Sequence, residues 1–178
     1  MSENREIRFV DPQSDELFTI PDGGRIIVTR PMGEMYPGVQ EQWVGECRFM
    51  DSCHVSVNGS VNGSCYHIDQ FYDIQKRIGA KIEPETEPEV VSGYRVTART
   101  FVGDKVFKLG HNPNAPEPYG TWMCFKSEND RNSFGHYWSD KSTARTDFFL
   151  RADAERTGRA YDHTALIKEN KSRDDGAR

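Results

Sequence analysis

Turn-forming dipeptides between short apolar runs constrain the fold of this chain most strongly. Asp22-Gly23 separates the run LFTI from the run RIIVT, and the apolar runs after residue 42 lead to Asn58-Gly59 and its near repeat Asn62-Gly63. Such pairs favour the positive backbone φ angles of tight hairpin turns. We therefore expect antiparallel strands in the first half of the chain at residues 17–20, 25–29, 42–50, 54–57 and 64–68, with the first two joined as a hairpin.

The second half of the chain repeats this pattern. The runs YRVTARTF and KVFKLG flank VGD, and the runs TWMCF and FGHYW flank the polar segment KSENDRNS. Residues 94–100 alternate between apolar or small side chains and polar ones, as in a strand with one buried face. These features predict two further hairpins.

Helix signals follow the strands. Asp69 is a candidate N-cap, Phe71, Ile74 and Ile78 form one apolar stripe, and Gly79 can end the helix in a left-handed conformation. Later in the chain, Ser139 or Asp140 can cap a helix that runs to about Thr157 and stops at Gly158. A short third helix is expected from Asp162.

This order of elements predicts an α+β fold of antiparallel β-hairpins with about three helices. An echo between YHIDQFYDIQKRIG and YWSDKSTARTDFF leaves open an arrangement of two β-β-α units. We expect a flexible leader at residues 1–16, in which IRFV could add a short strand, a single domain at 17–168 and a flexible tail at 169–178. The acidic, proline-containing segment 84–91 is where a subdomain boundary would fall.

Composition narrows the functional classes. A net charge of -5 argues against a protein whose main affinity is non-specific attraction to phosphate backbones. Ten Phe, seven Tyr and three Trp in 178 residues indicate an aromatic-rich core. The N-terminal residues lack the apolar run of a signal peptide, and no apolar stretch has the length of a membrane span. These features predict a cytoplasmic location and no membrane partner.

A metal site is one candidate for the chemistry. Cys53, Cys65 and His67, with His54 beside them, offer the sulfur and imidazole ligands that zinc prefers. Their spacing differs from the common zinc signatures, and strand alternation sends Cys53 and His54 to opposite faces. We therefore expect no cofactor, with zinc kept as the alternative to thiols packed as small apolar side chains.

A nucleophilic site is a second candidate. Cys124 and His136 lie on the two strands of one predicted hairpin, and Asp140 follows closely enough to orient the imidazole. Hairpin neighbours also arise for structural reasons alone. The sequence therefore favours a protein without catalysis and keeps these three residues as the catalytic alternative.

Basic and aromatic residues form the third candidate. Such combinations bind nucleic acids through stacking and phosphate contacts, or anchor protein interfaces. Acidic residues are interleaved among the basic ones, which is also typical of a solvated surface, and the tryptophans are equally suited to a core. The candidate binding residues are Arg95, Arg99, Trp122, Tyr137, Trp138 and Arg145.

One stretch carries a family resemblance. The run CHVSVNGSCYHIDQFYDIQKRIGAKIEPE, written with the doubled VNGS as one copy, spans about residues 53–85. It resembles segments of small uncharacterised accessory proteins carried by conjugative elements of gut bacteria. The resemblance includes no catalytic motif and implies a cytosolic accessory protein of a mobile element.

These observations favour a non-enzymatic accessory or binding protein that acts through a protein partner or a nucleic-acid contact. The alternative is a hydrolase or a nucleic-acid-modifying enzyme that uses a Cys/His/Asp site or a zinc site.

Overall fold

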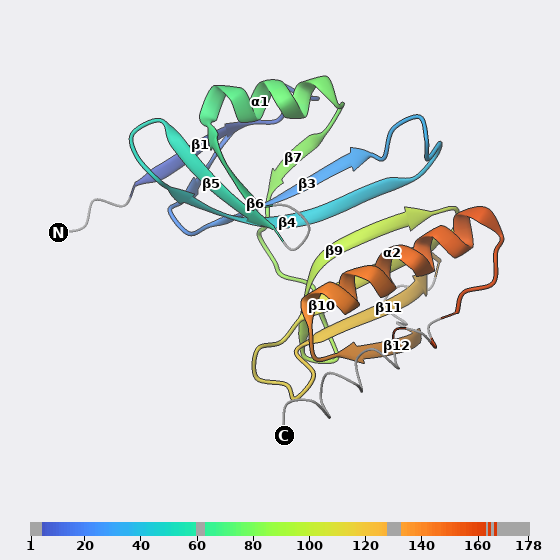
Figure 1. Ribbon diagram of the computed structural model, residues 1–178. Coiled ribbons are helices and arrows are strands. Elements are labelled where there is room, and N and C mark those ends of the chain that lie inside the picture. The colour runs from blue at the N-terminus through green and yellow to red at the C-terminus, as the bar shows by residue number, and fades with distance from the viewer. Residues whose placement is uncertain (1–4, 60–62, 128–132, 163, 165, 167–178) are drawn as a thin grey trace. The chain divides into compact units, whose positions relative to one another are not determined.

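The computed structural model describes residues 5–59, 63–127, 133–162, 164 and 166, and the chain divides into two compact units (Figure 1). Unit 1 spans residues 1–88 and unit 2 spans residues 89–178. The single domain at residues 17–168, with a possible subdomain boundary at 84–91, stays a prediction. The division falls inside the segment 84–91, where charge and proline content point to a boundary.

Unit 1 is built on a five-stranded antiparallel sheet. Its strand order is β7-β3-β4-β5-β6. β4 forms a hairpin with β5, and β5 forms a hairpin with β6. β7 comes after the first helix in the chain and pairs with β3. The bounds are β3 (Arg25–Pro31), β4 (Gln40–Phe49), β5 (His54–Gly59), β6 (Gly63–His67) and β7 (Lys81–Pro84). The strands predicted at 42–50, 54–57 and 64–68 are confirmed.

A separate two-stranded sheet precedes this one. β1 (Glu6–Val10) pairs antiparallel with β2 (Leu17–Pro21), so residues expected to form a loose leader contain a strand. Ile7 and Phe9 alternate onto its buried side, at 0% and 4% exposure. This burial explains why a mostly polar segment is ordered.

The hairpin predicted from residues 17–20 and 25–29 is wrong, although both strands exist. β2 pairs with β1, and β3 pairs with β4 and β7. A turn is present, because the Gly24 N–H donates to the Pro21 carbonyl at 2.7 Å and Gly23 has a φ of 82°. Backbone hydrogen bonds of Gly23 and Gly24 with Cys47 attach this turn to β4, so it passes the chain from one sheet to the other.

Helix α1 (Ile68–Arg77) follows β6 and begins before the predicted cap. His67 is the N-cap and Asp69 lies in the first turn, where its carboxylate still complements the helix dipole. The predicted end is confirmed, since Gly79 has a φ of 68° and its N–H donates to the Lys76 carbonyl. Phe71 carries the buried face and contacts the ring of Phe9, with centroids 5.8 Å apart.

Unit 2 is a meander of four long strands, β9 to β12, and the short strand β8 pairs with β9. Each pairs antiparallel with the next, which confirms the hairpins predicted around VGD and around the polar segment KSENDRNS. Residues 128–132 of that segment lie outside the described part. The bounds are β8 (Val90–Val91), β9 (Tyr94–Val102), β10 (Lys105–His111), β11 (Tyr119–Phe125) and β12 (Ser133–Trp138).

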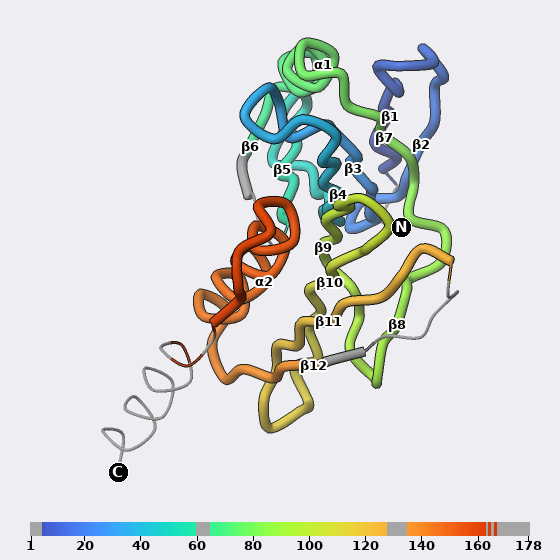
Figure 2. Tube along the Cα trace, turned by 90° about the vertical axis from the view of Figure 1, so that its right-hand side faces the viewer, coloured from blue at the N-terminus to red at the C-terminus, as the bar shows by residue number. Residues whose placement is uncertain are grey.

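Helix α2 (Lys141–Thr157) lies over one face of this sheet in both views (Figures 1 and 2). Asp140 caps it by accepting the Thr143 N–H at 2.8 Å, and Gly158 ends it with a φ of 67°, as predicted. Ala144, Phe148 and Ala152 are buried on its inner face. In the described residues, neither helix is long and apolar enough to cross a membrane.

The predicted fold class is wrong in its proportion of strand to helix. Strands dominate the described residues and are joined into larger antiparallel sheets, whereas the prediction was of separate hairpins with about three helices or of two β-β-α units. The cause is long-range pairing such as β3 with β7, which local turn signals do not encode. Most of the helix expected from Asp162 and the tail at 169–178 lie outside the described residues.

Candidate functional site

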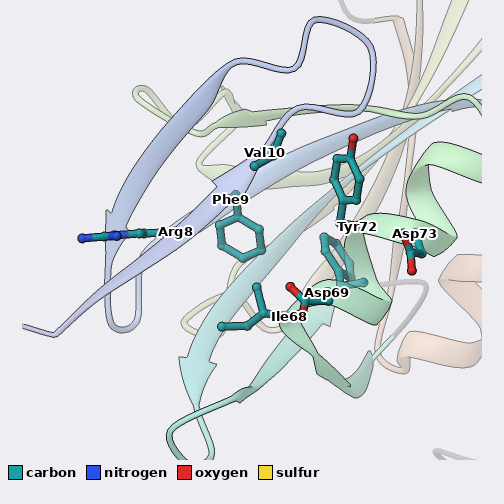
Figure 3. Close-up of a pocket in the computed structure, with 8 residues that line it drawn as sticks. Arg8, Phe9, Val10, Ile68, Asp69, Tyr72 and Asp73 are labelled. Atoms are coloured by element: carbon teal, nitrogen blue, oxygen red, sulfur yellow. The ribbon is translucent and has the colours of Figure 1, made fainter.

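Unit 1 contains a pocket of about 410 Å³ between β1 and α1 (Figure 3). Phe9 and Ile68 contribute apolar surface, while the guanidinium of Arg8 points away from the helix in Figure 3. The carboxylates of Asp69 and Asp73 lie one turn apart on α1 and have the same charge. This pocket therefore offers an apolar surface, with one cation turned away from the helix and two carboxylates on the helix.

Unit 2 contains a larger pocket of about 580 Å³ with a different lining. Strands β10, β11 and β12 supply one side, and the last turns of α2 with the segment after it supply the other. Charged, aromatic and apolar side chains meet there. The lining residues are Lys105, Phe107, Met123, His136, Arg151, Ala154, Glu155, Gly158, Arg159 and Tyr161.

A fully buried carboxylate organises the inner wall of this pocket. Asp147 has 0% exposure and accepts hydrogen bonds from the hydroxyls of Thr121 and Tyr161. Nδ1 of His136 lies 3.2 Å from each carboxylate oxygen, and Nε1 of Trp138 donates at 3.3 Å. Four side chains from three parts of unit 2 therefore converge on one carboxylate.

The local fold accounts for this convergence. Thr121 and His136 are opposite each other in the β11–β12 register, so their side chains leave the same face of the sheet. Asp147 and Arg151 are one helical turn apart on the inner face of α2 and point toward that pair. The NH1 group of Arg151 donates to the backbone carbonyl and to the hydroxyl of Thr121, both at 3.2 Å.

The network keeps its carboxylate charged. Burial by itself would raise the pKa of Asp147, but hydrogen bonds from His136, Thr121 and Tyr161 outweigh burial, so its pKa lies below the ordinary value of 3.8. Burial and the bond to Asp147 both raise the pKa of Tyr161, which keeps its hydroxyl protonated as a donor. Burial lowers the pKa of Arg151, and the charge of Asp147 acts against that effect.

The rim of the pocket is more exposed and carries charges of both signs. Lys105 donates to the Glu155 carboxylate at 2.6 Å, which joins β10 to α2. Arg159 follows the end of the helix and makes no ion pair with any residue that the structure describes. The rim thus has one cation held by a carboxylate and one cation at the surface.

The predicted nucleophilic trio does not converge. His136 contacts Asp147, and Asp140 is occupied as the cap of α2. Cys124 is buried, and strand alternation from Thr121 places its side chain on the sheet face opposite His136. Of the three predicted catalytic residues, only His136 lies in the pocket.

The predicted binding residues do not form one surface. Trp122 and Trp138 are 2% and 3% exposed, and they lie on opposite faces of the sheet. Trp122 contacts the rings of Tyr94 and Tyr137, whereas Trp138 bonds to Asp147. Arg95, Arg99 and Arg145 are all partly buried, and Arg99 is paired with Glu89.

The predicted metal ligands are only partly together. His67 lies opposite His54 in the β5–β6 register, with ring centroids 5.5 Å apart, but Cys65 is exposed and pairs with Ser56. Cys53 instead contacts Asp51 and His54. The alternation argument against Cys53 with His54 fails because β5 begins at His54, and Cys53 lies in the bend before it.

Asp147, Arg151, Thr121 and Tyr161 are not among the site residues predicted from the sequence. A signal for two of them exists, because residues 144, 147, 148, 151 and 152 share one helical face. An aspartate and an arginine at two of these positions indicate charged groups on the buried side of α2. No local pattern indicates that Thr121 and Tyr161 contact that aspartate.

No family model, curated protein or solved structure matches this chain.

Proposed function

We propose that unit 2 binds a small organic anion with an apolar body in the pocket between α2 and strands β10–β12. The observation that carries this proposal is Arg159, a cation at the rim with no ion pair in the described residues, above the apolar side chains of Phe107 and Met123. An anionic group would bind Arg159 while the rest of the ligand lies on the apolar wall.

The charges of the lining support an anion. Lys105, Arg151 and Arg159 are positive, and the carboxylates of Glu155 in the lining and of Asp147 behind it balance two of these three charges. Lys105 is bound to Glu155, and Arg151 is held by Thr121. Arg159 is therefore the cation best placed to form a new charge-assisted hydrogen bond.

The size and surface of the pocket support an apolar ligand body. A volume of about 580 Å³ is in the range of small-molecule sites, which are mostly apolar with a few polar groups that fix orientation. Phe107 and Met123 face each other in the β10–β11 register, and Ala154 adds a small side chain from α2. His136 and Tyr161 are held in place by Asp147 and can orient the ligand.

This proposal keeps the class of a non-enzymatic binding protein, with a small-molecule ligand in place of the protein or nucleic-acid contact expected from the sequence. An accessory role on a mobile element remains part of the proposal and rests on the resemblance of residues 53–85.

The test is binding of an aromatic sulfonate dye such as anilinonaphthalene sulfonate, measured by fluorescence at low salt, with displacement by medium-chain fatty acids. We expect saturable binding to the folded protein, weakened about tenfold or more by Arg159→Gln, since a hydrogen bond to a charged group contributes about 1.5–3 kcal/mol. Arg77→Gln, at an exposed position in unit 1, is the matched control and should leave the affinity unchanged.

Two results would refute the proposal. One is equal dye affinity in the Arg159→Gln and Arg77→Gln proteins. The other is displacement by acetate as effective as displacement by the longer acids, because acetate lacks the apolar body. Circular dichroism of each variant verifies that the dye reports a pocket rather than an unfolded chain.

A further inference from the structure

The bend before β5 brings three metal-ligating side chains together in unit 1. Asp51, Cys53 and His54 offer an oxygen, a sulfur and a nitrogen that all lie within 4.8 Å of one another. Sγ of Cys53 is 3.4 Å from Nδ1 of His54 and 3.4 Å from Oδ1 of Asp51. Nδ1 of His54 is 3.0 Å from the same Oδ1 and 2.9 Å from Oδ2 of Asp51.

These separations match one face of a coordination tetrahedron. With zinc bonds of about 2.0–2.3 Å, two ligands of a tetrahedral site are roughly 3.2–3.7 Å apart. Two of the three separations fall in that range, and the His54 to Asp51 separation is shorter by a few tenths of an ångström. A mixed sulfur, imidazole and carboxylate set favours zinc over magnesium or calcium, which prefer oxygen ligands alone.

His67 lies outside this cluster and beside it in the sheet. It lies opposite His54 in the β5–β6 register, and its ring is nearly perpendicular to that of His54 at a centroid separation of 5.5 Å. Two imidazoles on one tetrahedral zinc have centroids roughly 5 Å apart, given zinc–nitrogen bonds of about 2.0–2.1 Å.

A structural role of Asp51 is compatible with metal binding. Its Oδ1 accepts the backbone N–H groups of Cys53 and His54 at 2.9 and 2.8 Å, which shapes the bend. This use of Oδ1 leaves Oδ2 on the side of His54. The same two bonds fix the Asp51 side chain against the bend that carries Cys53 and His54.

The geometry points to a zinc site formed by Asp51, Cys53 and His54 at the start of β5, with His67 turning in from β6 as the fourth ligand. It differs from the site predicted from the sequence by including Asp51 and excluding Cys65. It is independent of the anion pocket, since all four ligands belong to unit 1.

The test uses the full chain, purified without a metal-affinity tag and titrated with zinc against a chromophoric chelator. We expect one zinc per chain, and an affinity lowered at least about tenfold by Cys53→Ser, since even outer partners of metal ligands contribute roughly 10–100-fold. Cys65→Ser is the matched control and should bind as the wild type does. Cobalt in place of zinc should give the visible spectrum of a tetrahedral site with a sulfur-to-metal band.

A second readout does not depend on any variant. Cys53 and Cys65 are the accessible thiols of the described residues, whereas Cys47 and Cys124 are buried. Zinc should slow alkylation of Cys53 and leave that of Cys65 unchanged. Equal zinc affinity in the two serine variants, an octahedral cobalt spectrum, or no protection of Cys53 would each overturn the site.

Discussion

Asp147 shows how a single residue can depend on its surroundings for its charge. A buried carboxylate is costly unless it is paired and hydrogen-bonded, and Asp147 receives hydrogen bonds from Thr121, Tyr161, His136 and Trp138. These donors hold β11, β12 and α2 together as well as the carboxylate. The network is therefore a support of unit 2 as well as a wall of the pocket.

The stability of unit 2 should depend on pH through this residue. The pKa of Asp147 is lowered in the folded state, so its contribution is fully present above the unfolded value of about 4 and is lost as the pH falls through the folded value. We expect Asp147→Asn to lower the free energy of unfolding by about 3 kcal/mol at pH 7, and by less as the pH falls below about 4. Urea unfolding measured across this pH range tests the expectation.

Asp153→Asn provides the matched control on the same helix. Its carboxylate is about 41% exposed and pairs with Arg156 three residues on, so its loss should change the unfolding free energy by less than about 1 kcal/mol. A difference between wild type and Asp147→Asn that stays constant from pH 7 to pH 2 would contradict the assigned role of the charge.

Only part of this site could be predicted from the sequence. The helical spacing of Asp147 with Ala144 and Phe148 indicates burial, because that spacing is local. The donors at residues 121, 136 and 161 come from different elements, and their meeting depends on strand register and on how α2 lies on the sheet. His136 was selected for a different reason, its position across a hairpin from Cys124.

At the scale of elements, Trp122 and three glycines define the second face of the unit 2 sheet. The indole lies over Gly110, Gly120 and Gly135, which occupy β10, β11 and β12. A Cβ at Gly120 would lie 2.2 Å from Cη2 of Trp122, far inside contact distance. The glycines therefore leave the space that this ring needs, and their lack of a side chain is a packing requirement.

Gly120→Ala should accordingly destabilise the protein. The added methyl must displace the ring of Trp122, and overpacking of this kind costs about 1–3 kcal/mol. The thermal midpoint should fall, and circular dichroism in the near ultraviolet should show a changed tryptophan environment.

A double-mutant cycle isolates the cause. In a Trp122→Leu background, the same Gly120→Ala change should cost clearly less, because the smaller side chain leaves room for the methyl. If Gly120→Ala costs the same free energy in both backgrounds, the glycine acts through its backbone and not through Trp122.

The elements show where local signals suffice. Asp140, Gly158 and Gly79 lie at the helix ends predicted for them, because caps are decided by a few neighbouring residues. The pairing of β2 with β1 could not be predicted from such local signals. The turn at Asp22-Gly23 forms, but hydrogen bonds to distant Cys47 decide where the following strand goes.

At the scale of the whole molecule, Glu89 stands at the start of unit 2, and its side chain is partly buried, with 27% exposed. Its carboxylate accepts from Nζ of Lys108 at 2.5 Å and from Nε of Arg99 at 2.7 Å, and the Lys108 side chain is only 6% exposed. Burial alone would raise the pKa of Glu89, but these two cations outweigh it and lower the pKa. The acidic segment 84–91 therefore marks the boundary and also supplies a counter-charge.

A fragment of residues 86–178 tests whether unit 2 carries its own stability. It retains Glu89 and the whole meander with α2, so we expect a cooperative unfolding transition in urea. Glu89→Gln in this fragment should lower the free energy of unfolding by about 3–5 kcal/mol, because it leaves Arg99 and Lys108 without their shared carboxylate. Glu87→Gln, two residues earlier and exposed, should have almost no effect. Equal losses in the two variants would show that the segment acts only through its total negative charge, since both changes remove one charge from it and only one removes the partner of the buried cations.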